Sequence, residues 1–121
     1  LLEEELATLI ACMKDLKRRG VRILPGGDYG AGVTNPMGTN ARDLEHFVAL
    51  AGFTPAEALV AATKHGGECF GERLGVIAEG WLADLLLVDG DPLADLALLR
   101  DPAKLLLVMQ DGRIHRRAPG H

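Results

Sequence analysis

Aromatic residues are scarce in this sequence of 121 residues, at 4% of the total. A hydrophobic core must therefore be built mainly from Leu, Val, Ile and Ala, and the hydrophobic content of 48% can supply it. No stretch approaches the roughly 20 apolar residues of a membrane-spanning helix. This composition disfavours both a membrane protein and a disordered chain.

Positive charge is also sparse, because the net charge is −4 and the one basic block is Lys17-Arg18-Arg19. That block closes a helical pattern, where cations suit the helix dipole. Nucleic-acid binding is therefore not expected. The two cysteines, Cys12 and Cys69, lie far apart, and we expect free buried thiols in a reducing compartment rather than a disulfide.

The first residues carry no initiator methionine, no basic region and no apolar region of the signal-peptide type. An opening inside a helical pattern predicts that the chain is truncated. Because no targeting segment is visible, a cytoplasmic location is the default expectation.

Helical patterns dominate the first half of the sequence. Apolar residues recur at helical spacing over residues 3–19, and Gly20 is placed to end that helix. A second helix is expected from residue 40 to residue 51, with Thr39 or Asn40 as its N-cap.

A third helix has a strong start signal. Thr54 is a typical N-cap, Pro55 suits the first helical position, and Glu57 completes a capping box. This helix is predicted to run to about Lys64, followed by a separate short turn at residues 68–70.

The last part of the sequence predicts a small antiparallel β unit over residues 74–117. Strands are expected at residues 83–88, 105–110 and 113–115. The last two flank Asp111-Gly112, the preferred dipeptide of a two-residue hairpin.

One further strand is expected at Val21–Leu24, and the glycine turn after it leads to Asp28. This strand has no partner adjacent in sequence, and a sheet of a few short strands is marginal alone. Both elements therefore need neighbours that the chain lacks. From the residues alone, Asp28 is either a turn residue or a carboxylate presented at the end of a strand.

Five segments, in order, resemble metal-dependent amidohydrolases of the imidazolonepropionase and Xaa-Pro dipeptidase type. They are residues 26–28 (Gly-Gly-Asp), 40–45, 54–63, 74–85 and 108–113. The resemblance covers nearly the whole chain and identifies it as a C-terminal fragment of such an enzyme.

The resemblance implies an α/β fold made of the C-terminal part of a (β/α)8 TIM barrel and part of a small β-sandwich. Residues 1–73 would hold the last helix–strand unit of the barrel and the helices that follow it. Residues 74–117 would form part of a composite β-sandwich, and residues 118–121 a tail.

The resemblance also implies roles for two residues. Asp28 would be the catalytic carboxylate and a metal ligand, which orients the attacking water and later passes the proton to the leaving nitrogen. Tyr29 would bind substrate, with packing against the barrel rim as the alternative. The implied cofactor is zinc, other divalent metals being open, with most of its ligands outside this chain.

Other metal-ligand patterns are missing from the sequence. It has four histidines but no His-x-His and no His-Glu-x-x-His. A catalytic zinc site needs about three protein ligands, so the chain alone is predicted to be inactive. Four acidic residues do not follow EF-hand spacing and are interpreted as turn and strand-edge residues. They are Asp84, Asp89, Asp91 and Asp95.

The implied function is hydrolysis of an amide-like C–N bond in a small cyclic amide or a dipeptide-like substrate, with metal-activated water. The alternative is an inactive fragment, or a non-enzymatic α/β association module that needs a partner chain. The partner would be the missing N-terminal part of the same protein or a companion chain, and self-association into a homo-oligomer is a further option.

Overall fold

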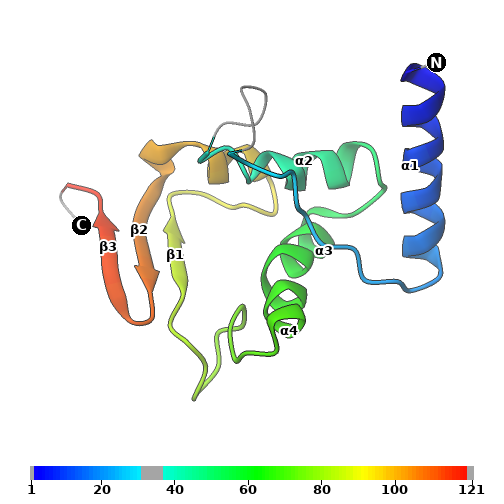
Figure 1. The fold of residues 1–121 in the computed structure, drawn as a ribbon. Coiled ribbons are helices and arrows are strands. Elements are labelled where there is room, and N and C mark those ends of the chain that lie inside the picture. The colour runs from blue at the N-terminus through cyan, green and yellow to red at the C-terminus, as the bar shows by residue number, and fades with distance from the viewer. Residues whose placement is uncertain (1, 31–36, 120–121) are drawn as a thin grey trace.

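The computed structural model describes residues 2–30 and 37–119, and it combines helices with one sheet (Figure 1). The helical elements are α1 (Leu2–Arg18), α2 (Arg42–Ala49), α3 (Pro55–Val60), η1 (Ala61–His65), α4 (Gly66–Phe70), η2 (Leu96–Arg100) and η3 (Pro102–Lys104). The strands are β1 (Leu85–Val88), β2 (Leu105–Gln110) and β3 (Arg113–Arg117). The predicted α/β class is therefore confirmed.

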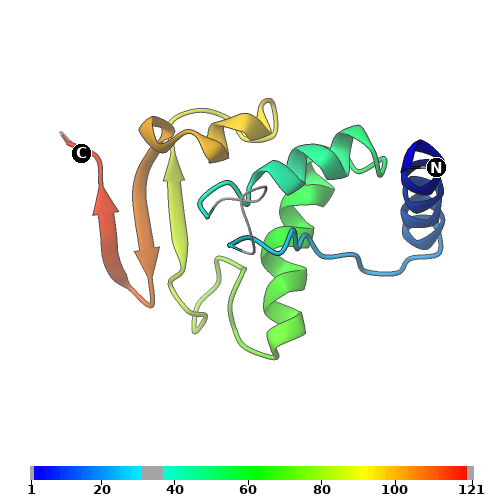
Figure 2. The ribbon, with the colours of Figure 1, turned by 45° about the horizontal axis from the view of Figure 1, so that its top comes forward.

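Helix α1, the group of α2, α3 and α4, and the sheet lie in that order across the molecule (Figures 1 and 2). Helix α1 lies at one end, the sheet lies at the other, and α2, α3 and α4 lie between them (Figures 1 and 2). Helix α1 agrees with the predicted helix, and Gly20 ends it with a φ of 77°. Among the described residues, no helix is both long enough and apolar enough to cross a membrane.

Lys17, near the end of α1, binds the segment that leads into α3. The Lys17 ammonium donates to the Gly52 carbonyl at 2.8 Å and to Glu57 Oε2 at 2.9 Å. It also lies 4.9 Å from the centre of the Phe53 ring, within the range of a cation–π contact. No residue of α1 is buried, so this helix presents apolar side chains to solvent.

The predicted capping box at the start of α3 is confirmed. The Thr54 hydroxyl accepts from the Glu57 N–H at 3.2 Å, and Glu57 Oε2 accepts from the Thr54 N–H at 2.8 Å. The hydrogen bond from the Thr54 backbone, followed by the bond from Lys17, lowers the pKa of Glu57 from 4.5 to about 2. Glu57 therefore joins the end of α1 to the start of α3.

The prediction that the third helix ends near Lys64 is wrong. Elements α3, η1 and α4 follow one another without a break to Phe70, and η1 is a π-helical turn. Glycine usually weakens a helix, but here its small size permits a close backbone contact. A Cβ on Gly67 would lie 2.1 Å from the Leu74 carbonyl oxygen. The segment that leaves the helices thus packs directly against them.

The predicted strand at Val21–Leu24 does not form. These residues are extended but pair with no strand in the described parts of the chain. A β-strand requires a hydrogen-bonded neighbour, and none is available here. Side chains hold the segment instead, since Ile23 packs against the core and Arg22 pairs with Glu68 of α4.

Two smaller predictions also need correction. The N-cap of α2 is Ala41 rather than Thr39 or Asn40, and it has helical dihedral angles (φ −62°, ψ −14°) and no side-chain cap. Cys12 and Cys69 are free as predicted, but both are exposed rather than buried.

The predicted antiparallel unit is confirmed as a three-stranded sheet in the order β1-β2-β3. Asp111 and Gly112 form the hairpin turn with φ values of 48° and 73°, as the prediction of a two-residue hairpin requires. The carboxylate of Asp84 accepts from the Asp111 N–H at 2.7 Å and fixes this turn to the start of β1.

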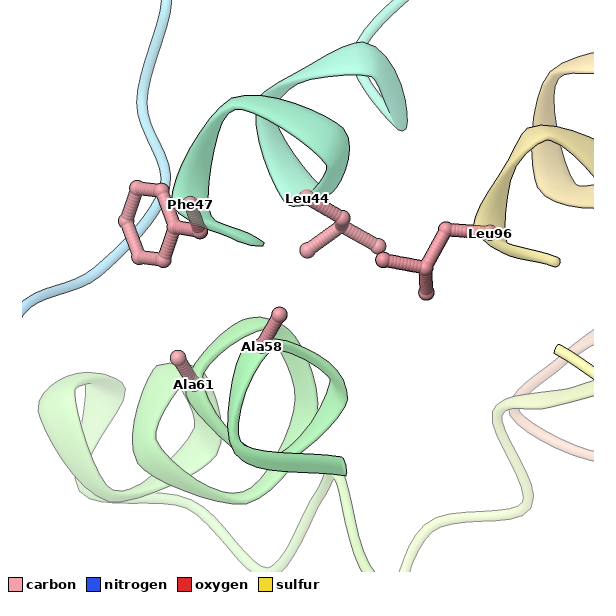
Figure 3. Packing of buried hydrophobic residues seen from close by; sticks show 5 residues of the cluster. All are labelled: Leu44, Phe47, Ala58, Ala61 and Leu96. Atoms are coloured by element: carbon pink, nitrogen blue, oxygen red, sulfur yellow. The ribbon is translucent and has the colours of Figure 1, made fainter. Parts of the chain in front are cut away.

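The core lies where the helices meet the segment between β1 and β2. Figure 3 shows the α2 residues Leu44 and Phe47 facing Ala58 and Ala61, with Leu96 of η2 reaching the same space. All five are buried. Through α2, the core therefore joins the helical half of the chain (α1 to α4) to the sheet half (β1 to β3 with η2 and η3).

The close contact at Gly67 predicts opposite effects for two neighbouring substitutions. Gly67→Ala should destabilise the fold by about 1–3 kcal/mol, because the new methyl group collides with backbone. Gly66→Ala is the matched control: its Cβ meets nothing within 4 Å, so it should stabilise the helix by about 0.5–1 kcal/mol. Urea unfolding measures both, and a change of the same sign in the two variants would contradict the contact.

The capping box predicts a specific pH dependence of stability. The folded-state pKa of Glu57 lies below its ordinary value, so its contribution is fully present above pH 4.5 and is lost as the pH falls toward about 2. Urea unfolding of Glu57→Gln should therefore show a deficit at pH 6 that shrinks toward pH 2. In Glu79→Gln, which alters an exposed loop carboxyl, little change is expected at any pH.

Candidate active site

Asp28 lies at the end of the extended segment and is exposed to solvent. Its φ is 52°, in the left-handed region that Asp tolerates better than most residues. This conformation turns the chain sharply after Gly26 and Gly27, so that the carboxylate stands at a bend rather than along a strand.

Tyr29, the residue after Asp28, has the outer end of its ring between Asp43 and Gly27. Its hydroxyl donates to Asp43 Oδ1 in the first turn of α2 at 2.6 Å. Its ring covers Gly27, where an added Cβ would lie 2.5 Å from Tyr29 Cε2 and 3.1 Å from Asp43 Oδ1. Gly27, Tyr29 and Asp43 thus lie together beside the bend at Asp28.

The electrostatics of Tyr29 follow from this contact. The hydrogen bond to the Asp43 carboxylate is the main cause that raises the pKa of Tyr29, and burial and the negative charge of Asp43 act in the same direction. Arg42 lies close enough to favour the ionised form and opposes part of the shift. The hydroxyl therefore stays protonated at neutral pH and serves as a hydrogen-bond donor.

The role of Asp43 could not be read from the sequence. Its one local signal is a carboxylate in the first turn of a helix, which the helix dipole already explains. The partner lies 14 residues earlier in the sequence. Asp43 is the functional candidate that the structure adds to Asp28 and Tyr29.

A cleft of about 780 Å³ separates the helices from the sheet, and most of its wall is apolar. Pro25 and Gly26, just before Asp28, form part of that wall. Its polar side chains include Asp43, Thr63 and Asp84, and each is already bonded within the chain. The cleft is therefore an apolar space between two layers rather than a polar binding site.

Asp28 does not belong to a group of metal ligands in the described residues. Within residues 2–30 and 37–119, no group of three or more His, Cys, Asp or Glu side chains is placed to hold a metal ion. A carboxylate oxygen suits zinc, but a catalytic site takes about three protein ligands. The described residues therefore do not form a metal site by themselves, and Asp28 can supply one ligand at most.

The other acidic residues singled out in the sequence have structural partners, as the turn and strand-edge interpretation predicts. They are Asp84 (bonded to the Asp111 N–H), Asp89 (2.9 Å from Lys104 Nζ), Asp91 (bonded to the Leu93 N–H) and Asp95 (bonded to the Ala97 N–H). Asp91 and Asp95 each close a turn two residues ahead, which is a common role of Asp.

The sequence profile of the amidohydrolase family matches residues 3–115. The chain belongs to the amidohydrolase family. The prediction drawn from the five ordered motifs is therefore confirmed. In sequence, the chain is 31% identical over 106 residues to the ochratoxinase of Aspergillus niger, which covers 85% of this chain and 21% of that protein.

Other relatives agree with this assignment. The chain is 34% identical over 98 residues to the 5-methylthioadenosine/S-adenosylhomocysteine deaminase of Dictyoglomus thermophilum, covering 70% of this chain and 22% of the deaminase. The crystal structure of A. niger ochratoxinase superposes with a TM-score of 0.80 at 28% identity, over 92% of this chain and 25% of that one.

The crystal structure of a candidate prolidase from Bifidobacterium longum gives a TM-score of 0.79 at 36% identity, over 93% of this chain and 27% of that one. This amidohydrolase chain thus spans about a fifth of its curated relatives and about a quarter of the solved structures.

The contact between Tyr29 and Asp43 predicts a measurable titration. Tyr29 is the single tyrosine of the 121 residues, so absorbance at high pH reports on it alone. We expect its pKa to lie above the ordinary value and to fall toward it in Asp43→Leu. Glu45→Gln removes a carboxylate from the same helix and should leave the titration unchanged. An identical pKa in the parent chain and in Asp43→Leu would contradict the contact.

Proposed function

We propose that this chain is the C-terminal part of an amidohydrolase that hydrolyses an amide-like C–N bond in a small cyclic amide or a dipeptide-like substrate. The observation that carries the proposal is the family match over residues 3–115, with Asp28 presented at the bend that follows an extended segment. The names of the relatives support the bond type, since a prolidase and a deaminase both break a bond between carbon and nitrogen.

In this proposal, residues 1–73 belong to a (β/α)8 barrel and residues 74–117 to part of a β-sandwich. The extended segment at Val21–Leu24 supports the first part, because a barrel would provide the neighbouring strands that it lacks here. The exposed side chain of Leu87 in β1, at 53%, supports the second, because it does not line the cleft toward the helices. A second sheet packed on that face would cover it.

Asp28 is the residue proposed to carry the chemistry. Hydrolysis of an amide requires that a water lose a proton and that the leaving nitrogen gain one. A carboxylate at the C-terminal end of a barrel strand faces the substrate site and can do both in turn. The exposure of Asp28 leaves its carboxylate accessible for this role.

A divalent metal, zinc or another, belongs to the proposal as a cofactor of the whole protein. Such an ion lowers the pKa of a water molecule and so prepares it for attack. Asp28 would contribute one ligand, and the others would come from residues outside this chain. Tyr29 would line the substrate pocket with the face of its ring, since its hydroxyl is bonded to Asp43.

The second candidate is an association module without activity of its own. It is favoured by the apolar side chains that α1 and β1 expose, including Leu6, Leu9 and Leu86. Large exposed apolar surfaces mark contacts with another chain. The partner would be the rest of the same protein, a companion chain or a second copy.

Intact mass and metal analysis of the purified protein that carries this chain separate the two candidates. An amidohydrolase predicts a longer species or a second chain with about one or two zinc ions per assembly. A single species of 121 residues without metal would favour the association module.

The role of Asp28 predicts the effect of one substitution in that assembly. Asp28→Asn keeps the size of the side chain but removes the proton acceptor, so kcat for hydrolysis of an Xaa-Pro dipeptide should fall about 100-fold or more. Asp91→Asn, which alters a turn residue near the sheet, is the matched control and should retain activity. Equal activity of Asp28→Asn and the parent protein would exclude Asp28 as the catalytic carboxylate.

A further inference from the structure

We infer that Tyr29 and Asp43 form a positioning pair that fixes the Asp28 carboxylate for reaction, with Gly27 providing the space for it. This inference rests on the proposed function, because it assigns new roles around the residue proposed to act in hydrolysis. Neither Tyr29 nor Asp43 needs to touch the substrate through its polar atoms for this role.

The first support is the shape of the bend. Asp28 is the one residue between Gly27 and Tyr29, and its φ of 52° is an uncommon conformation for a residue with a side chain. A conformation of this kind persists only where its surroundings hold it. The contacts of Tyr29 begin one peptide bond after Asp28, so they act directly on the bend.

The second support is the absence of a side chain at Gly27. The Tyr29 ring occupies the position that a Cβ at Gly27 would need, with Cε2 at 2.5 Å and Cζ at 3.0 Å from it. Any larger residue would push the ring away from Asp43. The glycine before the aspartate is therefore explained by the ring that folds over it.

The third support is the rigidity of the acceptor. Asp43 precedes Leu44, which is buried in the core at 5% exposure, so the first turn of α2 is fixed by packing. A hydrogen bond of 2.6 Å to a carboxylate is short and charge-assisted. The pair thus connects an exposed bend to a packed helix.

A reacting carboxylate benefits from such a connection. A catalytic group must stay close to its productive geometry, and residues around it supply the restraint. A small displacement can reduce the rate about 100-fold even when the group itself is intact. Loss of the pair should therefore affect the chemical step more than the binding of substrate.

The test uses the whole protein that carries this chain, with an Xaa-Pro dipeptide as the substrate probe and zinc as the metal probe. Tyr29→Phe and Asp43→Leu should each lower kcat about 10-fold to 100-fold and leave KM within about twofold. The double variant should be no worse than either single one, because both remove the same hydrogen bond. Zinc affinity, measured by competition with a chelator, should fall about 10-fold in the same variants.

Two variants control for a merely structural effect. Asp43→Asn keeps an acceptor oxygen for the tyrosine hydroxyl and should recover most of the kcat lost in Asp43→Leu. Glu45→Gln alters another carboxyl of α2, which pairs with Arg100 at 2.6 Å, and should match the parent protein.

The outcomes separate this inference from the function on which it rests. An active, zinc-binding parent protein with unchanged kcat and zinc affinity in Tyr29→Phe would overturn the positioning pair alone. Additive losses in the double variant, or equal losses in Glu45→Gln, would also overturn it. A parent protein that binds no divalent metal and cleaves neither an Xaa-Pro dipeptide nor a cyclic amide would overturn the proposed function, and the positioning role with it.

Discussion

The apolar face of α2 is the surface on which the rest of the structure depends. Leu44 and Phe47 of this helix are buried against Ala58 and Ala61 on one side and against Leu96 on the other (Figure 3). The burial of these side chains is the main apolar contact that joins the helical half to the sheet half, and the salt bridge between Glu45 and Arg100 runs alongside it. The close approach of the Leu74 backbone to Gly67 is a second contact between the two parts.

The same helix links the core to the candidate site. Its first turn carries Asp43, and packing of the next residue, Leu44, fixes where the Asp43 carboxylate lies. Tyr29 bonds to that carboxylate and thereby places the bend at Asp28. The packing of Leu44 thus restrains Asp43, and the hydrogen bond from Tyr29 to Asp43 extends that restraint to the bend at the exposed Asp28. An exposed residue can in this way have a defined position without being buried itself.

The features that could be predicted from the sequence are those that short-range chemistry determines. The hairpin at Asp111-Gly112 needs left-handed backbone at two adjacent residues, and the capping box at Thr54 and Glu57 closes within three residues. The helix that continues past Lys64 could not be predicted, because Gly66 and Gly67 usually weaken a helix and the close approach of the Leu74 backbone to Gly67 leaves no local signal. The resemblance identified Asp28, but nothing local indicated that Asp43 would hold Tyr29 beside it.

The failure of Val21–Leu24 to form a strand and the absence of a group of metal ligands from the described residues have a common physical explanation in the proposed barrel. In such a fold, the hydrogen-bond partners of a strand and the other ligands at its C-terminal end come from the same neighbouring strands. A chain that spans about a quarter of its solved relatives would contain neither the partner strands nor the other ligands. The segment keeps its extended form and its bend because Ile23, Arg22 and Tyr29 are held from the helical side. In this proposal the helical side positions Asp28, and the neighbouring strands of the barrel would determine what it can bind.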